Sequence, residues 1–183
     1  GVFSHGVLPD RPGFKTLLTK LRSRKISSLV FLGHDPMGVA MKQARTVGIK
    51  AQFYTVGTIT SPGYQKSAGP AAEGALVAFW QAPKTRAYND FIEKFVAVAG
   101  RKPILELATI PTYDAVNIII NELRSTNGVS GKSLSAKLYE VEDYKGLSGS
   151  ITIDKDGAVR SIEEDIFLFQ NGGLFPVVDI GSL

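Results

Sequence analysis

The sequence contains no cysteine and only two histidines among its 183 residues. Without cysteine, a disulfide scaffold, a thiolate nucleophile and a Cys-ligated zinc site are all excluded, while the redox compartment stays open. His5 and His34 have no histidine partner at the i, i+4 spacing that a helical zinc site requires. We therefore expect neither a metal nor a cofactor.

Catalytic motifs are equally scarce. Ser4, His5 and Asp10 are the residue types of a hydrolase triad, but closeness in sequence is not triad geometry. The chain has no G-x-S-x-G elbow, and its glycines form neither a dinucleotide fingerprint nor a phosphate-binding loop. The stretch "DKDG" at 154–157 lacks the later acidic ligands of a calcium loop and is better interpreted as a β-turn. We predict that the protein is not an enzyme.

Long apolar runs are also missing, since none approaches the roughly 20 residues that span a membrane. Hydrophobic residues make up 44% of the chain and charged residues 21%, which is typical of a globular protein with one or two small cores. The net charge is +4, but the basic residues are spread over polar helix faces without interleaved aromatic residues. This pattern does not predict nucleic-acid binding.

Apolar runs and helical patterns alternate in the first part of the chain. Short apolar runs, which predict buried strands, are bounded by turn residues and separated by amphipathic segments. Strands that alternate with helices imply parallel pairing through right-handed crossovers, so the fold class is α/β. The predicted strands are 2–8, 27–33, 51–57 and 75–80, and the predicted helices between the first three are 14–24 and 36–47.

The rest of the chain predicts helices first and antiparallel strands afterwards. Helical spacing covers 85–100, 111–128 and 131–141, and we interpret Tyr113 and Asp114 as capping and core residues at a helix start. After Gly146, the turns "KDG" and "NGG" join short apolar runs and predict hairpins. The expected C-terminal tail is therefore antiparallel β.

Four stretches of the sequence carry a resemblance to a known family. They are "GFKTLLTKLRSRKISSLVFLG", "MKQARTVGIKAQFYTVG", "SAGPAAEGALVAF" and "YKGLSGSITIDKDGAVR". Together they resemble the C-terminal half of a type I periplasmic solute-binding protein of ABC importers, in the branched-chain amino-acid (Leu/Ile/Val) binding family. The resemblance runs over nearly the whole chain.

The resemblance implies a periplasmic-binding-protein type I fold, a clamshell of two α/β lobes with the ligand in the cleft between them. It assigns 1–76 to the second lobe, 77–145 to a helical segment of the first lobe, and 146–183 to the return into the second lobe. The N-terminal half of such a protein is absent from this sequence. We therefore expect a partial chain, whether a truncated piece, a proteolytic product or a degenerate paralogue, from which the signal peptide is missing.

The same resemblance suggests ligand-binding residues at the strand ends. The family commonly places an aromatic residue at the first of them, where His34 is the closest match, and often a carboxylate at the second, where this chain has Gly57 followed by Thr58. An α-amino acid is therefore disfavoured unless Asp35 supplies the charge, and a carboxylate without an ammonium group, an aromatic acid or an amide is open. Asp35 is also interpreted as the cap of the helix that follows it. Trp80, at another strand end, is interpreted as a core or hinge residue, with stacking on a ligand as the alternative.

These observations predict the substrate-binding component of an ABC importer for branched-chain amino acids or related small carboxylates or amides. Its expected partners are the small-molecule ligand and a membrane permease, in the periplasm or another extracytoplasmic space. One alternative is a ligand-sensing domain of a receptor or regulator, and another is a small α/β enzyme that uses His34 and Asp35. Helices 85–99 and 112–126 would expose apolar faces without the missing half, and a homodimer would bury them.

Overall fold

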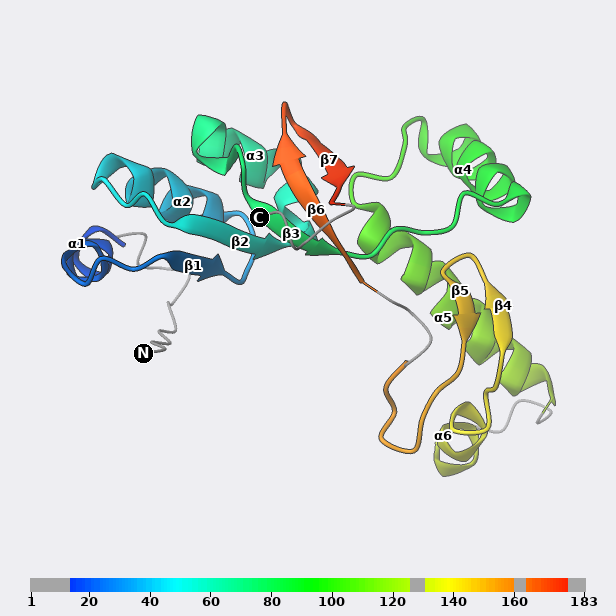
Figure 1. Ribbon diagram of the computed structural model, residues 1–183. Helices are drawn as coiled ribbons and strands as arrows, with labels where there is room; N and C mark the ends of the chain where they lie inside the picture. Colours follow the sequence, from blue (N-terminus) through cyan, green and yellow to red (C-terminus); the bar gives the residue numbers. More distant parts are fainter. Residues whose placement is uncertain (1–13, 126–130, 160–163, 178–183) are drawn as a thin grey trace. The chain divides into compact units, whose positions relative to one another are not determined.

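The computed structural model describes residues 14–125, 131–159 and 164–177 (Figure 1). The chain divides into two compact units, one formed by Gly1–Phe79 with Asp165–Leu183 and the other by Trp80–Glu164. The predicted strand at 2–8 lies outside the described residues. Each unit is described by itself below.

A five-stranded mixed sheet forms the first unit. Its order is β1-β2-β3-β6-β7, with the first three strands parallel and the last two antiparallel. The α/β class, the three predicted parallel strands and the hairpin at "NGG" are confirmed. The strands are β1 (Ser28–Phe31), β2 (Gln52–Val56), β3 (Leu76–Phe79), β6 (Asp165–Gln170) and β7 (Gly173–Pro176).

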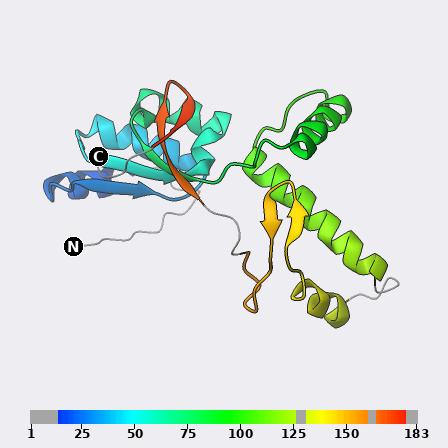
Figure 2. The ribbon, with the colours of Figure 1, turned by 45° about the vertical axis from the view of Figure 1, so that its right-hand side comes forward.

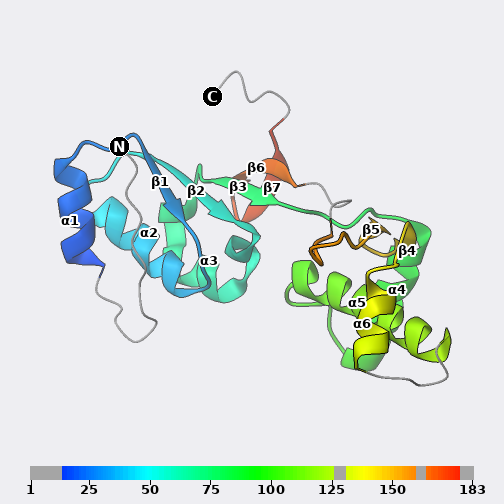
Figure 3. The same cartoon turned by 90° about the horizontal axis from the view of Figure 1, so that it is seen from below.

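Helices cover one face of this sheet (Figures 1 and 3). Both helices predicted between the first strands are present, and the Gly-rich stretch before β3 forms a short helix between two 3-10 turns. Ser61 begins that short helix, because its hydroxyl accepts a hydrogen bond from the Tyr64 amide at 3.1 Å. The elements are α1 (Lys15–Ser23), α2 (Pro36–Thr46), η1 (Gly57–Thr60), α3 (Pro62–Ala68) and η2 (Gly69–Ala72).

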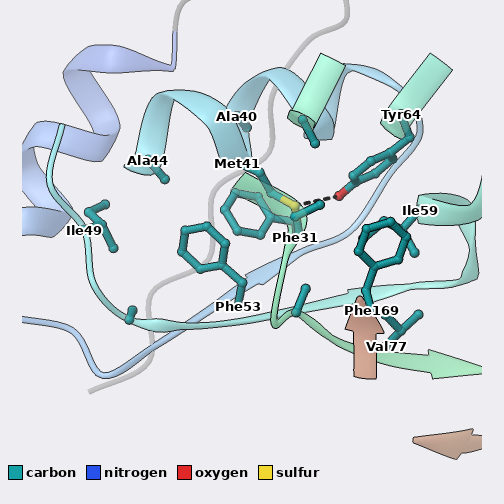
Figure 4. Close-up of a cluster of buried hydrophobic side chains, with 14 of the residues drawn as sticks. Phe31, Ala40, Met41, Ala44, Ile49, Phe53, Ile59, Tyr64, Val77 and Phe169 are labelled. Carbon is teal, nitrogen blue, oxygen red and sulfur yellow. Dashed lines mark hydrogen bonds between the residues drawn. The ribbon is translucent and has the colours of Figure 1, made fainter. Parts of the chain in front are cut away.

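The main hydrophobic core lies between the sheet and these helices (Figure 4). Phe31 of β1 and Phe53 of β2 meet edge to face, with ring centroids 4.9 Å apart. Met41 and Tyr64 close the core from the helix side, where the tyrosine hydroxyl lies 3.7 Å from the methionine sulfur. Because strand side chains alternate between faces, only every second residue of each strand enters this core.

The second unit consists of helices and a small hairpin. The hairpin lies beside the long helix α5 (Figure 2), which begins at Glu106 instead of the predicted 111. Pro111, where the predicted helix began, lies in the second turn of α5, and its missing N–H removes a single helical hydrogen bond. The elements are α4 (Arg86–Ala99), α5 (Glu106–Ser125), α6 (Lys132–Leu138), β4 (Tyr144–Gly146) and β5 (Gly149–Ile151).

The boundary between the units falls at Phe79 and Trp80, and again between Glu164 and Asp165. The second division is later than the return at 146 expected from the sequence, because Leu147 and Ile151 pack into two small cores of the second unit. The assignment of these units to the lobes of a two-lobed protein stays a prediction.

Asp114 anchors the hairpin to α5. Its side chain is only 1% exposed, and its carboxylate accepts the backbone N–H groups of Leu147 at 2.8 Å and Ser148 at 2.7 Å. Gly146 leaves room for it, since a Cβ there would come within 2.7 Å of the carboxylate carbon. Capping of a helix start was the wrong interpretation of Asp114, because α5 begins eight residues earlier, at Glu106.

We predict that Asp114→Ala lowers the free energy of unfolding by about 2–4 kcal/mol, because two buried amides lose a charged acceptor. Asp114→Asn, which keeps one acceptor oxygen, is expected to cost less. Urea unfolding followed by circular dichroism measures both, with Glu93→Ala on the exposed side of α4 as the control. If Asp114→Ala were no more destabilising than Glu93→Ala, the anchoring role would be wrong.

Candidate functional site

The carboxyl ends of β1 and β2 form two neighbouring corners at one edge of the sheet. From β1 the chain turns through Gly33 and His34 into α2, and from β2 it turns through Gly57 and Thr58 into η1. The Thr58 hydroxyl donates a hydrogen bond of 2.6 Å to the carbonyl oxygen of Gly33 and joins the two corners. In open α/β sheets, ligands bind at this edge of the strands.

His34 presents an exposed side chain at the first corner. Its backbone carbonyl accepts the Met37 amide at 2.8 Å, which fixes the main chain at the start of α2. The imidazole makes no hydrogen bond or ion pair with the described residues. The ring therefore has both nitrogens free to contact a ligand.

Asp35 does not cap α2, which corrects the interpretation made from the sequence. Its own backbone angles are helical, and its carboxylate makes no capping hydrogen bond. One carboxylate oxygen instead accepts the Ser61 hydroxyl at 2.6 Å, and the Asp35 carbonyl accepts the Ser67 hydroxyl at 3.1 Å. Gly63 leaves space for the carboxylate, because a Cβ there would collide with it. Asp35 thus links the start of α2 to both ends of α3.

The Ser61 link was missed in the sequence, although a signal for it was present. A serine followed by Pro62 is typical of a helix cap with proline in the first turn. The partner of that serine could not be read from the sequence, because Asp35 lies 26 residues away.

Gly57 brings no side chain to the second corner. It is buried at the start of η1, and its carbonyl accepts the Thr60 hydroxyl at 2.7 Å. A carboxylate that the sequence did not suggest, Asp165, begins β6 opposite Phe79 and so lies at the same edge of the sheet. This edge of the sheet therefore carries two carboxylates, those of Asp35 and Asp165. The second corner contributes no carboxylate.

Trp80 is the one predicted site residue in the second unit. It is half-buried and packs against a cluster formed by Ala82, Tyr88, Ile110 and Leu147. This packing agrees with a core or hinge residue. Whether Trp80 also meets a ligand stays a prediction.

A cluster of titratable side chains joins α4 to α5 in the second unit. The Tyr88 hydroxyl donates to Glu106 at 2.6 Å, and Lys84 contacts both, at 2.6 Å and 3.0 Å. Burial, together with the bond to Glu106, raises the pKa of Tyr88. Burial opposes ionisation of Glu106, but its bonds to Tyr88 and Lys84 outweigh that effect and lower its pKa. The three side chains are hydrogen-bond partners of one another, so we interpret the cluster as a structural link between α4 and α5.

The described part of the first unit is strongly basic. Its only acidic residues are Asp35, Glu73 and Asp165. Most of this positive charge lies on α1, on α2 and at the amino ends of β1 and β2, and not at the carboxyl ends of the strands. The basic residues are Lys15, Lys20, Arg22, Arg24, Lys25, Lys42, Arg45, Lys50 and Lys66.

Among the residues that the structure describes, no three or more potential metal ligands lie close together, so they indicate no metal site. The described helices also include none with the length and apolar character needed to cross a membrane. A catalytic pair of His34 and Asp35 is not supported either, because the two side chains make no hydrogen bond with each other, and the carboxylate of Asp35 accepts from Ser61 instead.

Comparison with curated proteins finds relatives named for the ligands they bind. The chain is 28% identical over 153 residues to the Leu/Ile/Val-binding protein homolog 2 of Brucella abortus, covering 83% of this chain and 41% of that protein. It is 25% identical over 185 aligned positions to the Leu/Ile/Val-binding protein of Escherichia coli, covering 94% of this chain and 46% of that protein.

Solved structures show the same fold. The leucine-binding protein LivK of Thermotoga maritima matches with a TM-score of 0.76 at 19% identity, over 95% of this chain and 51% of that one. LivJ of Streptococcus pneumoniae in complex with isoleucine matches with a TM-score of 0.68 at 19% identity, over 92% of this chain and 48% of that one. A Rhodopseudomonas palustris solute-binding protein in complex with benzoate matches with a TM-score of 0.73 at 14% identity, over 93% of this chain and 48% of that one. The chain spans about half the length of the proteins it matches.

Residues 4–171 match the family model described as periplasmic binding protein. The family is one of non-enzymatic solute-binding proteins, as the absence of catalytic motifs from the sequence predicted. By this match over most of its length, the chain belongs to the periplasmic binding protein family, among relatives named as Leu/Ile/Val-binding proteins.

Proposed function

We propose that these residues are part of the substrate-binding component of an ABC importer for branched-chain amino acids or related small carboxylates or amides. The observation that carries the proposal is the family match over residues 4–171, together with relatives named for Leu, Ile and Val. The protein would work in the periplasm or another extracytoplasmic space. Its closed, ligand-bound form would dock on a membrane permease.

The ligand is expected to lie against the corners at Gly33–His34 and Gly57–Thr58. The bond from Thr58 to the Gly33 carbonyl holds these corners together, so the wall is formed before the ligand arrives. His34 would donate a hydrogen bond to the ligand carboxylate. Trp80, just beyond the end of β3, stays a proposed ligand contact through its apolar ring.

Asp35 would decide between an amino acid and a carboxylate without an ammonium group. Its Oδ1 atom accepts the Ser61 hydroxyl, which holds the side chain in one orientation at the exposed corner. A carboxylate held in this way remains an acceptor for a ligand ammonium. Gly57 offers no alternative, so selectivity at these two corners depends on a single acidic side chain.

We predict that the protein expressed from the whole gene binds at least one of L-leucine, L-isoleucine, L-valine, 4-methyl-2-oxopentanoate and benzoate. His34→Ala should weaken that binding about tenfold, because one hydrogen bond to a charged group is lost. Isothermal titration calorimetry measures both, with Lys42→Ala on the exposed side of α2 as the control. The proposal would be contradicted if none of the five ligands bound, or if His34→Ala left the affinity of the bound ligand unchanged.

A second prediction concerns Asp35. L-leucine and 4-methyl-2-oxopentanoate share a carbon skeleton and differ in the ammonium group, so they form a matched pair. Asp35→Asn should weaken L-leucine about tenfold and leave the oxo acid unchanged, because only the ammonium needs the negative charge. Asp165→Asn, at the start of β6 and paired with Phe79 of β3, serves as the comparison.

Calorimetry again decides the result. If L-leucine binds tightly and Asp35→Asn leaves its affinity unchanged, Asp35 is not the partner of the ammonium group. If only Asp165→Asn weakens it, that role belongs to Asp165.

A further inference from the structure

The amino ends of β1 and β2 carry a cluster of basic side chains. α1 ends just before β1 begins and α2 just before β2, and both chain reversals lie at the left of Figure 1. Arg22, Lys25 and Lys50 line one hollow of about 330 Å³ there, and the other residues that line it are uncharged. We call this cluster the basic end of the first unit, and it consists of Lys20, Arg22, Lys25, Arg45 and Lys50.

The two arginines of the basic end have a structural role. Arg22 donates a hydrogen bond of 3.1 Å to the carbonyl oxygen of Val47, which follows the last turn of α2. Arg45 donates two hydrogen bonds of 3.0 Å, to the carbonyl oxygens of Ile49 and Ala51. Carbonyl groups at the end of a helix carry partial negative charge and favour cations beside them. The arginines therefore join α1 to the segment between α2 and β2 and hold the basic end in a fixed shape.

The three lysines of the basic end have no comparable role. Lys20, Lys25 and Lys50 are exposed, and their ammonium groups form no hydrogen bond or ion pair with the described residues. Every ion pair that joins two described residues lies in the second unit. These three charges therefore have no counter-ion in the described part of the first unit.

The acidic residues described in the first unit are bound or positioned elsewhere. Asp35 and Asp165 lie at the carboxyl ends of the strands, and Glu73 accepts the backbone N–H of Asn171 at 3.0 Å in the turn between β6 and β7. Charges of one sign that gather on one part of a surface raise the local potential and attract partners of the opposite charge. The basic end is therefore suited to bind anions, and it does so away from the candidate ligand site.

We propose that the basic end binds the phosphate groups of an anionic membrane surface. Its charges are spread over the ends of two helices and the starts of two strands, so an array of phosphate groups contacts more of them than one small anion does. A single carboxylate, such as benzoate, would contact only one or two of these groups and is not the expected partner. The proposal rests on the proposed function beside a membrane permease, but it does not depend on which small ligand is bound.

An acidic protein segment is a less suitable partner for the basic end. The centres of protein–protein interfaces are depleted in lysine and enriched in aromatic residues and methionine. The hollow lacks such residues, because its exposed lining residues are Arg22, Lys25, Ser27, Gly48 and Lys50. A hydrated lipid surface requires no apolar contact, and a strongly hydrated lysine ammonium can keep its water there.

Sedimentation with lipid vesicles tests the proposal. The protein expressed from the whole gene is mixed at low ionic strength with vesicles of phosphatidylglycerol and phosphatidylcholine in equal parts, or with vesicles of phosphatidylcholine alone. A basic side chain near an anionic lipid surface adds about fivefold to the affinity. We therefore expect binding to the anionic vesicles to be at least about tenfold tighter, and added sodium chloride to release the protein because it screens these charges.

A pair of double variants locates the binding surface. Lys25→Glu with Lys50→Glu should weaken binding to the anionic vesicles at least about tenfold. Lys66→Glu with Lys94→Glu, on the exposed sides of α3 and α4, is the matched control and should weaken it less than about threefold. Both double variants change the net charge equally, so a difference between them depends on where the charge lies.

Calorimetric titration with L-leucine and benzoate separates this proposal from the proposed function. Lys25→Glu with Lys50→Glu should leave the affinity of either ligand unchanged, because the basic end and the candidate site lie at opposite ends of the strands. Loss of vesicle binding with ligand binding intact would contradict only the surface proposed here.

Four results would overturn the proposal. The first is equal binding to both kinds of vesicle, and the second is binding that persists when salt is added. The third is equal weakening by the two double variants, which would show that net charge alone decides the binding. The fourth is an absence of vesicle binding. If inorganic phosphate then gave a saturable calorimetric titration that Lys25→Glu with Lys50→Glu abolished, the hollow would be a site for a free anion instead.

Discussion

The parallel pairing of β1, β2 and β3 is the constraint on which the rest of the first unit depends. Phe31 lies beside Thr55 and Val56 beside Ala78, so the three strands end at one edge. Parallel neighbours need a crossover, and α2 and the α3 region supply the two crossovers on the same side of the sheet. One face therefore forms the core, the other exposes Val30 and Leu32, and the loops that leave the strands converge at the candidate site.

Hydrogen bonds at this edge hold the two loops in a fixed arrangement. Thr58 binds the Gly33 carbonyl, and Ser61 binds Asp35 while it caps α3. Both bonds join segments more than twenty residues apart in sequence. His34 lies between these hydrogen-bonded loops, and its ring makes no hydrogen bond with the described residues. Such a side chain is suited to contact a ligand on a preformed surface.

Much of the fold could be predicted from the sequence, because apolar periodicity and turn residues are local signals. The alternation of strands and helices, the turn at "NGG" and the long helices after β3 all followed from such patterns. Features that depend on distant partners could not be predicted. Asp35 has the residue type and position of a cap, yet the nearby Ser61 hydroxyl decides its role. Likewise, Asp114 lies inside α5 and binds a hairpin more than thirty residues away.

The positions of the candidate site residues in the fold could be predicted in part, and their role in binding stays a prediction. His34, Gly57 and Thr58 were expected at neighbouring strand ends, and the structure places them at two joined corners. Asp165 was missed, because its position depends on an antiparallel strand that returns to β3 from the far end of the chain. The exposure of one sheet face was also invisible in the sequence, since continuous apolar runs predict strands buried on both sides.

Amide chemical-shift mapping of the protein expressed from the whole gene tests the central claim most directly, namely that a small carboxylate binds at the strand ends. Titration with isoleucine and with benzoate should shift Gly33, His34, Gly57 and Thr58 most strongly for at least one of the two. The amides around Gly48 and Lys50, at the opposite end of the strands, should stay in place. Shifts confined to that opposite end, or no saturable shifts with either ligand, would contradict the claim.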